Sequence, residues 1–129
     1  MNPAKTILLA EHDPFLINVY AVELRKCGYN ISVVSNGENV LNRVRNIEPD
    51  LMILDASLPN SESNYHGLSV LKLVKDDLIL KNLKVVMLCD AIQKKESEGK
   101  FFRLGSEKNF SKSESTAEEI AVEVKRLLN

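Results

Sequence analysis

The chain has 129 residues, of which 44% are hydrophobic and 27% charged, and its formal net charge is −1. These values are typical of one soluble globular domain with its own core. They give no electrostatic basis for binding nucleic acid, and no apolar run reaches the roughly 20 residues that span a membrane. Two distant cysteines, Cys27 and Cys89, and the lack of a signal peptide predict free thiols in the cytoplasm.

Short apolar runs along the chain predict buried strands. Four of them cover residues 6–10, 31–34, 51–54 and 85–88. Continuous apolar runs, rather than alternating ones, suit strands that are buried on both faces of a parallel sheet. A very short fifth strand is predicted at residues 109–110, mainly because Gly105 and the final helix must be separated.

Helical periodicity lies between these runs. Pro14 is expected in the first turn of a helix that runs to about Cys27, where Gly28 ends it. A second helix is predicted over residues 38–47, closed by Pro49. A third helix is predicted from an apolar stripe of Leu68, Leu71, Val74 and Leu78.

Two more helices are predicted in the last third of the chain. The fourth runs through residues 101–104 to Gly105, and its polar first half, residues 93–100, is expected to be held weakly. The last helix is predicted from a capping box of Ser115 and Glu118. Its apolar face consists of Ile120, Ala121, Val124, Leu127 and Leu128.

The alternation of strands and helices predicts an α/β fold. Five strand–helix units favour a five-stranded parallel sheet, doubly wound with helices on both faces. We expect residues 1–129 to form a single domain. Ligands of such sheets bind at the carboxyl ends of the strands, so the residues that follow each strand are the candidates for function.

Polar residues follow four of the predicted strands. They are Glu11, His12 and Asp13, then Asp55, then Cys89 and Asp90, and finally Ser111 and Lys112. Each has an ordinary explanation when taken alone, such as a turn acid, a helix cap or a surface lysine. Together they would place carboxylates and one ammonium in one pocket, where crowded acids need a cation such as Mg²⁺. A carboxylate beside such an ion can attack a phosphoryl group, whose charge a lysine neutralises.

Several segments resemble the receiver domain of bacterial response regulators. They are ILLAEHDP at residues 7–14, DLMILDASLP at residues 50–59, Gly67, VVMLC at residues 85–89, Gly105 and Lys112. The resemblance covers essentially the whole chain. It implies the flavodoxin-like, CheY-like fold and one receiver domain over residues 1–129.

The resemblance also implies a role for each matching residue. Asp55 would accept a phosphoryl group from a sensor histidine kinase or a phosphotransfer protein, and Lys112 would pair with the phosphoryl oxygens. Cys89 occupies the position of the hydroxyl residue that bonds the phosphoryl group on activation. Glu11 would help to hold Mg²⁺ through water, while Asp55 and the backbone carbonyl of Ser57 would bind it directly. The protein would be a signalling module and not an enzyme, with a downstream protein or fused effector as its output.

Some positions near Asp55 depart from the family pattern. His12 stands where the family has a direct metal-binding acid, and imidazole is a poor Mg²⁺ ligand, so the site either binds metal weakly or prefers another metal. Neighbouring Asp13 is a second candidate ligand, although the register set by Pro14 places it one residue too far along. Cys89 is a weaker hydrogen-bond donor than a hydroxyl, and a redox role would require a lowered pKa.

Further departures lie along the fourth and fifth strands. Asp90 adds negative charge where a phosphoryl group would sit. Asn109 replaces an aromatic residue that rotates on activation, and Phe110 should face the other side of the sheet. Ser113 replaces a proline, which predicts a trans peptide bond. Residues 60–66 lengthen the loop after Asp55 by about four residues relative to typical members of the family; they would cover the site, recognise a partner or form an inert surface insertion.

Two functions therefore stay open at this point. The first is a phosphorylatable receiver in a phosphorelay. The second is a degenerate pseudo-receiver that binds a partner protein without phosphorylation. A flavodoxin-like cofactor binder is disfavoured, because residues 11–14 (EHDP) are acidic where such a protein needs a phosphate-binding turn.

Overall fold

The computed structural model describes residues 3–59 and 67–129, so the predicted insertion at residues 60–66 lies outside the described residues. The described chain forms one five-stranded sheet with the order β2-β1-β3-β4-β5, and all its strand pairs are parallel. The strands are β1 (Thr6–Ala10), β2 (Asn30–Val34), β3 (Leu51–Asp55), β4 (Lys84–Cys89) and β5 (Lys108–Ser111). The predicted doubly wound α/β fold is confirmed.

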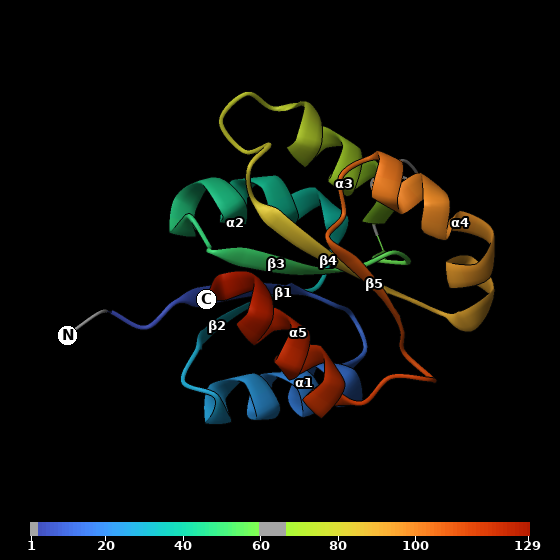
Figure 1. The fold of residues 1–129 in the computed structure, drawn as a ribbon. Coiled ribbons are helices and arrows are strands. Elements are labelled where there is room, and N and C mark those ends of the chain that lie inside the picture. The colour runs from blue at the N-terminus through green and yellow to red at the C-terminus, as the bar shows by residue number, and fades with distance from the viewer. Residues whose placement is uncertain (1–2, 60–66) are drawn as a thin grey trace.

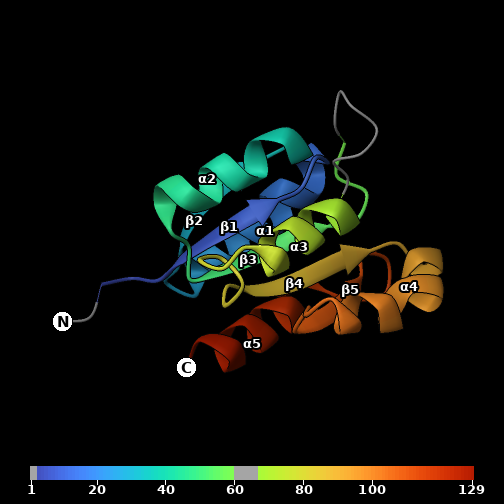
Figure 2. The same ribbon diagram turned by 90° about the horizontal axis from the view of Figure 1, so that it is seen from above.

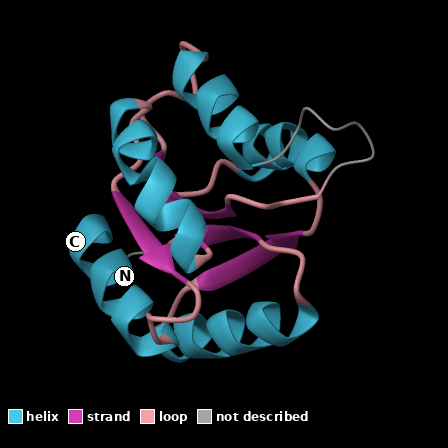
Figure 3. Cartoon of the chain, turned by 90° about the vertical axis from the view of Figure 1, so that its right-hand side faces the viewer, coloured by secondary structure: helices cyan, strands magenta, loops and turns pink. Residues whose placement is uncertain are grey.

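Helices cover both faces of this sheet (Figures 1 and 3). They are α1 (Pro14–Lys26), α2 (Val40–Ile47) after a short 3-10 turn, α3 (Gly67–Asp76), α4 (Ala91–Arg103) and α5 (Ala117–Leu128). Helices α1 and α5 lie on one face, and α2, α3 and α4 lie on the other (Figure 1). Among the described residues, no helix is both long and apolar enough to cross a membrane.

Each face of the sheet has its own hydrophobic core. Along β3, Met52 and Leu54 pack with Val70 of α3 in one core, whereas Leu51 and Ile53 pack against α1 and α5 in the other. Successive side chains of a strand point to opposite faces, so a strand buried on both faces needs an unbroken apolar run. This explains why the strands could be predicted from the apolar runs in the sequence.

Helix α4 differs most from its prediction. The helix begins at Ala91, so the whole polar segment from residue 93 to residue 100, which was expected to be held weakly, is helical. Its start is fixed by a capping box in which Asp90 accepts a hydrogen bond from the N–H of Gln93, and the Gln93 side chain accepts one from the N–H of Asp90. These bonds satisfy amide groups that the polar sequence would otherwise leave to water.

Two local predictions were wrong by small shifts. The capping box of α5 is formed by Thr116 and Glu119, one residue later than predicted. Leu78 does not belong to the apolar stripe of α3, because the helix ends at Asp76 and Leu78 is exposed. The cause is Asp77, whose Oδ1 accepts hydrogen bonds from two following backbone N–H groups and turns the chain.

Other predicted boundaries are confirmed. Pro14 begins α1, and Gly28 follows its end with a φ of 94°. The described residues contain no cis peptide bond, so the bond between Lys112 and Ser113 is trans, as predicted. The strands β1 and β4 point the same way along the sheet (Figure 2), which brings their carboxyl ends to a common edge.

Candidate functional site

Three charged side chains meet at the carboxyl edge of the sheet. Asp55 is the last residue of β3, Glu11 follows β1, and both are fully buried. Lys112 follows β5, and its Nζ lies 3.1 Å from Asp55 Oδ1 and 3.0 Å from Glu11 Oε2. The structure therefore brings together the acids and the lysine that the sequence placed after separate strands.

His12 completes this group, which we call the charged cluster (Glu11, His12, Asp55 and Lys112). Its Nδ1 lies 2.7 Å from Asp55 Oδ2 and 3.4 Å from Glu11 Oε1, and 42% of its side chain is exposed. Lys112 and His12 thus contact different oxygens of the same carboxylate. The imidazole forms the solvent side of the cluster.

The backbone around Asp55 is tightly fixed. Asp55 Oδ1 accepts a hydrogen bond of 2.9 Å from the N–H of Ser57. Gly67, the first residue of α3, packs directly on this segment, since a Cβ there would lie 2.2 Å from the carbonyl oxygen of Asp55 and 2.5 Å from Cα of Ala56. The start of α3 can approach the strand so closely only because residue 67 has no side chain.

Burial and like charge shape the electrostatics of the cluster. Burial, together with the nearby charge of Asp55, raises the pKa of Glu11. Burial alone would lower the pKa of Lys112, but the carboxylates of Asp55 and Glu11 outweigh it and raise that pKa above its usual value. Lys112 therefore stays charged and offsets part of the repulsion between the two acids.

Tyr20 of α1 is also buried near the cluster. Burial and the charges of Glu11 and Asp55 raise the pKa of Tyr20 to about 12. Its hydroxyl has no hydrogen-bond partner among the described residues. The phenol is therefore neutral at physiological pH.

Cys89 ends β4 and is fully buried. Burial, and then the charges of Asp55 and Asp90, raise the pKa of its thiol to about 12. A thiolate is the reactive form of cysteine, so this environment removes the basis for the redox role considered from the sequence. The backbone carbonyl of Cys89 accepts a 2.8 Å hydrogen bond from the N–H of Lys112, which ties the end of β4 to β5.

Two acids from the strand ends serve as helix caps. Asp13 Oδ1 accepts hydrogen bonds from the N–H groups of Phe15 and Leu16 at the start of α1. Asp13 is not one of the three side chains that offer clustered ligand atoms, which are Glu11, His12 and Asp55. Asp90 likewise caps α4, and its side chain is engaged there. Both acids thus have a structural use that accounts for their presence.

Neutral hydrogen bonds link the other wall of the site to α4, and we call them the α4 contacts. Gln93 Nε2 donates a 2.7 Å bond to Ser57 Oγ, two residues after Asp55. The second pair is buried, with Ser106 Oγ donating to Asn109 Oδ1 at 2.9 Å and Asn109 Nδ2 donating to the carbonyl of Glu98 at 3.4 Å. Asn109 is thus held by polar bonds where the family pattern has a rotating aromatic.

Phe110 packs in the core beneath α1 and α5, on the opposite face from Asn109 and α4, as the strand periodicity predicted.

The sequence interpretation missed the roles of Gln93 and Ser106. A signal for the first was present, because Asp90 and Gln93 have the spacing of a capping box. No sequence signal marks Ser106.

The charged cluster also has the donor atoms of a cation site. Glu11, His12 and Asp55 each offer one ligand atom, and these atoms all lie within 4.8 Å of one another. Glu11 Oε2 is buried and makes no hydrogen bond, although Lys112 Nζ lies nearby. Two buried carboxylates fit the oxygen preference of Mg²⁺, whereas the imidazole nitrogen does not belong to that preference.

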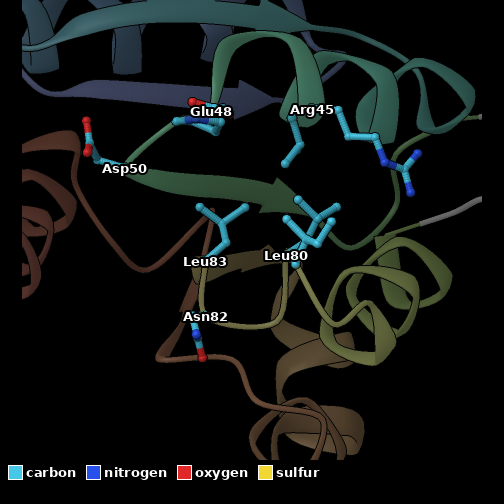
Figure 4. Close-up of a pocket in the computed structure, with 9 residues that line it drawn as sticks. Arg45, Glu48, Asp50, Leu80, Asn82 and Leu83 are labelled. Atoms are coloured by element: carbon cyan, nitrogen blue, oxygen red, sulfur yellow. The ribbon is translucent and has the colours of Figure 1, made fainter.

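A groove lies at the end of β3 opposite to the charged cluster (Figure 4). This groove has a volume of about 610 Å³, and its lining includes Arg45, Glu48, Asp50, Leu80 and Leu83. Two of its charged groups have structural partners, since Arg45 pairs with Asp77 and Asp50 Oδ2 accepts a hydrogen bond from the N–H of Thr6. The groove does not bring reactive groups together as the charged cluster does.

Comparison with known proteins gives a consistent result. The model of the response regulator receiver domain family matches residues 7–124. Over 82 residues the chain is 32% identical to the DNA-binding response regulator MtrA of Mycolicibacterium smegmatis, covering 64% of this chain and 33% of that protein. It is 26% identical over 76 residues to the alkaline phosphatase synthesis transcriptional regulatory protein PhoP of Bacillus subtilis, covering 59% of this chain and 30% of that protein. The matched segments span about a third of the length of these relatives.

Solved structures share the fold. A putative response regulator from Chloroflexus aurantiacus superimposes with a TM-score of 0.85 at 24% identity, covering 97% of this chain and 98% of that one. The receiver domain of the sensor histidine kinase PA1611 from Pseudomonas aeruginosa, which has a magnesium ion in its active-site cleft, gives a TM-score of 0.81 at 19% identity, with 97% and 98% coverage.

Proposed function

Because the chain belongs to the response regulator receiver domain family, a family of signalling modules, we propose that Asp55 is its phosphoacceptor in a cytoplasmic phosphorelay. One observation supports this proposal above the others. Asp55 Oδ1 is held at the same time by Lys112 Nζ at 3.1 Å and by the N–H of Ser57 at 2.9 Å. A fixed carboxylate beside a charged lysine is the arrangement that phosphoryl transfer to an acid requires.

The proposed step is a displacement at phosphorus. A carboxylate oxygen of Asp55 attacks the phosphorus of a phosphohistidine, and an O–P bond forms. The P–N bond breaks and its electron pair goes to the imidazole nitrogen of the donor. The other nitrogen of that ring already carries a proton, so the imidazole leaves in its neutral form. Lys112 neutralises the negative charge on the transferring oxygens, and the Ser57 N–H keeps the attacking carboxylate oriented.

A divalent cation is part of this proposal. The carboxylates of Glu11 and Asp55 and the backbone carbonyl of Ser57 are the groups that would hold Mg²⁺. The ion would supply positive charge to the transferring phosphoryl oxygens. The lysine and the cation together would offset the charge that the buried acids concentrate at this edge.

We further propose residues 1–129 as one receiver domain, with a sensor histidine kinase or a phosphotransfer protein as its donor. Its output would pass to a downstream protein or a fused effector. Some relatives carry DNA-binding names, which describe those whole proteins, each about three times the length of the matched segment.

Intact-mass spectrometry after incubation with a small phosphodonor and Mg²⁺ tests the proposal. We expect one phosphoryl adduct on the wild-type chain and none on Asp55→Asn. Asp50→Asn, at the other end of β3, is the matched control and should be labelled like the wild type, since an amide oxygen can still accept the Thr6 bond. An unlabelled wild type beside a labelled typical receiver, or an adduct that persists in Asp55→Asn, would reject the proposal and favour a phosphorylation-independent interaction module.

A further inference from the structure

We propose that the charged cluster selects a divalent transition-metal ion such as Co²⁺ or Zn²⁺ over Mg²⁺, with His12 Nδ1 as a ligand beside the carboxylates of Glu11 and Asp55. This inference rests on the proposed function, because it concerns the cation of the same site.

The spacing of the donor atoms is close to what one ion requires. Ligand atoms about 2.1 Å from a common ion lie about 3.0 to 3.4 Å apart in octahedral and tetrahedral arrangements. In the structure, His12 Nδ1 lies 2.7 Å from Asp55 Oδ2 and 3.4 Å from Glu11 Oε1. These two distances are within a few tenths of an ångström of the required values, and the three ligand atoms all lie within 4.8 Å of one another.

Lys112 contacts only one oxygen of Asp55 and leaves the other, Oδ2, to the His12 side. The lysine and the Ser57 N–H contact Asp55 Oδ1, whereas His12 faces Oδ2. Glu11 Oε1 is fixed by hydrogen bonds from the N–H groups of His12 and Asp13 and from Lys112 Nζ at 3.1 Å. Glu11 Oε2 is buried 3.0 Å from the same Nζ and makes no hydrogen bond. The carboxylates are thus oriented in advance, and the half-exposed imidazole offers a route from solvent.

The donor chemistry sets the preference. Mg²⁺ prefers oxygen ligands and loses its water reluctantly, whereas imidazole suits the later first-row divalent ions. A nitrogen at position 12 therefore raises affinity for a transition metal. The same residue takes the place of a carboxylate ligand and so lowers the affinity for Mg²⁺. Both effects favour the transition metal over Mg²⁺.

Calorimetric titration with Co²⁺ and with Mg²⁺, in the absence of any phosphodonor, tests this inference. All variants carry Cys27→Ser, because the exposed Cys27 thiol is a competing ligand. We expect the ratio of the Mg²⁺ Kd to the Co²⁺ Kd to fall by roughly tenfold or more in His12→Asp, which exchanges nitrogen for oxygen. Asp13→Asn keeps the helix cap and should leave the ratio unchanged. Equal ratios in the parent chain and His12→Asp would overturn the inference.

A second measurement does not depend on that variant. In protein labelled with ¹⁵N-histidine, Zn²⁺ should move the Nδ1 resonance of His12, assigned with His66→Gln, while Mg²⁺ should not. An unmoved His12 resonance at saturating Zn²⁺ would overturn the inference. Its failure is distinct from that of the proposed function. A chain that forms the Asp55 adduct with an unchanged metal ratio rejects only the inference, and a selective site that forms no adduct in either Mg²⁺ or Co²⁺ rejects only phosphorylation.

Discussion

The charged cluster and the α4 contacts lie on two sides of Asp55 and are built in different ways. On one side, Lys112 and His12 lie close to the carboxylates of Glu11 and Asp55, both of which are fully buried. On the other side, Ser57 and Asn109 are held by neutral amide and hydroxyl groups. Charge is concentrated on the side where we propose that chemistry occurs, and neutral bonds hold the side that contacts α4.

This difference has an energetic meaning. A buried charge is costly unless it is paired, so the charged cluster depends on each of its members. A neutral hydrogen bond contributes only about 1 kcal/mol net, so the α4 contacts can change one at a time at a modest cost. Changes on the two sides should therefore differ in size, and in their dependence on pH.

The largest expected effect contrasts two glycines. Gly67→Ala places a Cβ 2.2 Å from the Asp55 carbonyl oxygen, and we expect it to lower the free energy of unfolding by about 3 kcal/mol. Gly99→Ala, within α4, meets only the end of the Arg103 side chain at 3.4 Å and should raise stability by about 0.5 to 1 kcal/mol. Urea denaturation measures both, and equal effects would contradict the close packing on Asp55.

The next effect tests the charge balance of the cluster. Lys112→Met leaves the carboxylates of Glu11 and Asp55 together without their cation, and we expect a loss of about 2 to 3 kcal/mol at pH 7. Glu11 has a raised pKa, so its charged form opposes folding, and the loss should shrink as the pH falls and Glu11 takes up a proton. Lys108→Met on the exposed end of β5 is the control. A deficit that is independent of pH would show that charge is not its cause.

The sequence predicted the charged cluster better than the α4 contacts, for a physical reason. Parallel strands end at one edge of a sheet, so Glu11, Asp55 and Lys112 were expected to meet as soon as their strands were recognised. The contact of His12 with Asp55 depends on a side-chain direction, and the sequence alone does not contain that information.

The α4 region was harder to predict because its order comes from capping and not from hydrophobic periodicity. The helix buries few apolar side chains, so its pattern is weak, and the capping box at its start carries the missing signal. The Leu78 error has the same origin, since the apolar spacing continued past a turn that Asp77 imposes. Local polar bonds ended or extended helices where hydrophobic periodicity predicted otherwise.

A third prediction uses the two cysteines. The thiol of Cys89 ionises near pH 9 when unfolded, but its pKa in the fold is about 12, so unfolding is favoured as the pH rises above 9. We expect this residue to account for about 2 kcal/mol of the stability lost between pH 9 and pH 10.5. Cys89→Ala should flatten that decline, and Cys27→Ala, at an exposed position, should not. Chemical denaturation across this pH range gives the measurement. If stability falls equally steeply with pH in both variants, the fold does not raise the pKa of Cys89.

The smallest effect separates the two bonds of Gln93. Ser57→Ala removes only the bond to Gln93 Nε2 and should cost about 0.5 kcal/mol. Gln93→Ala also removes the side-chain oxygen that accepts from the N–H of Asp90, which is half of the capping box, and should cost about 1 kcal/mol. Glu119→Ala removes the equivalent half of the capping box of α5 and serves as the reference for capping alone. Hydrogen exchange should quicken in the first turn of α4 in both Gln93→Ala and Ser57→Ala. If exchange there is unchanged in Ser57→Ala, the bond does not couple the loop after Asp55 to α4, and the neutral side of the site is held by the helix cap alone.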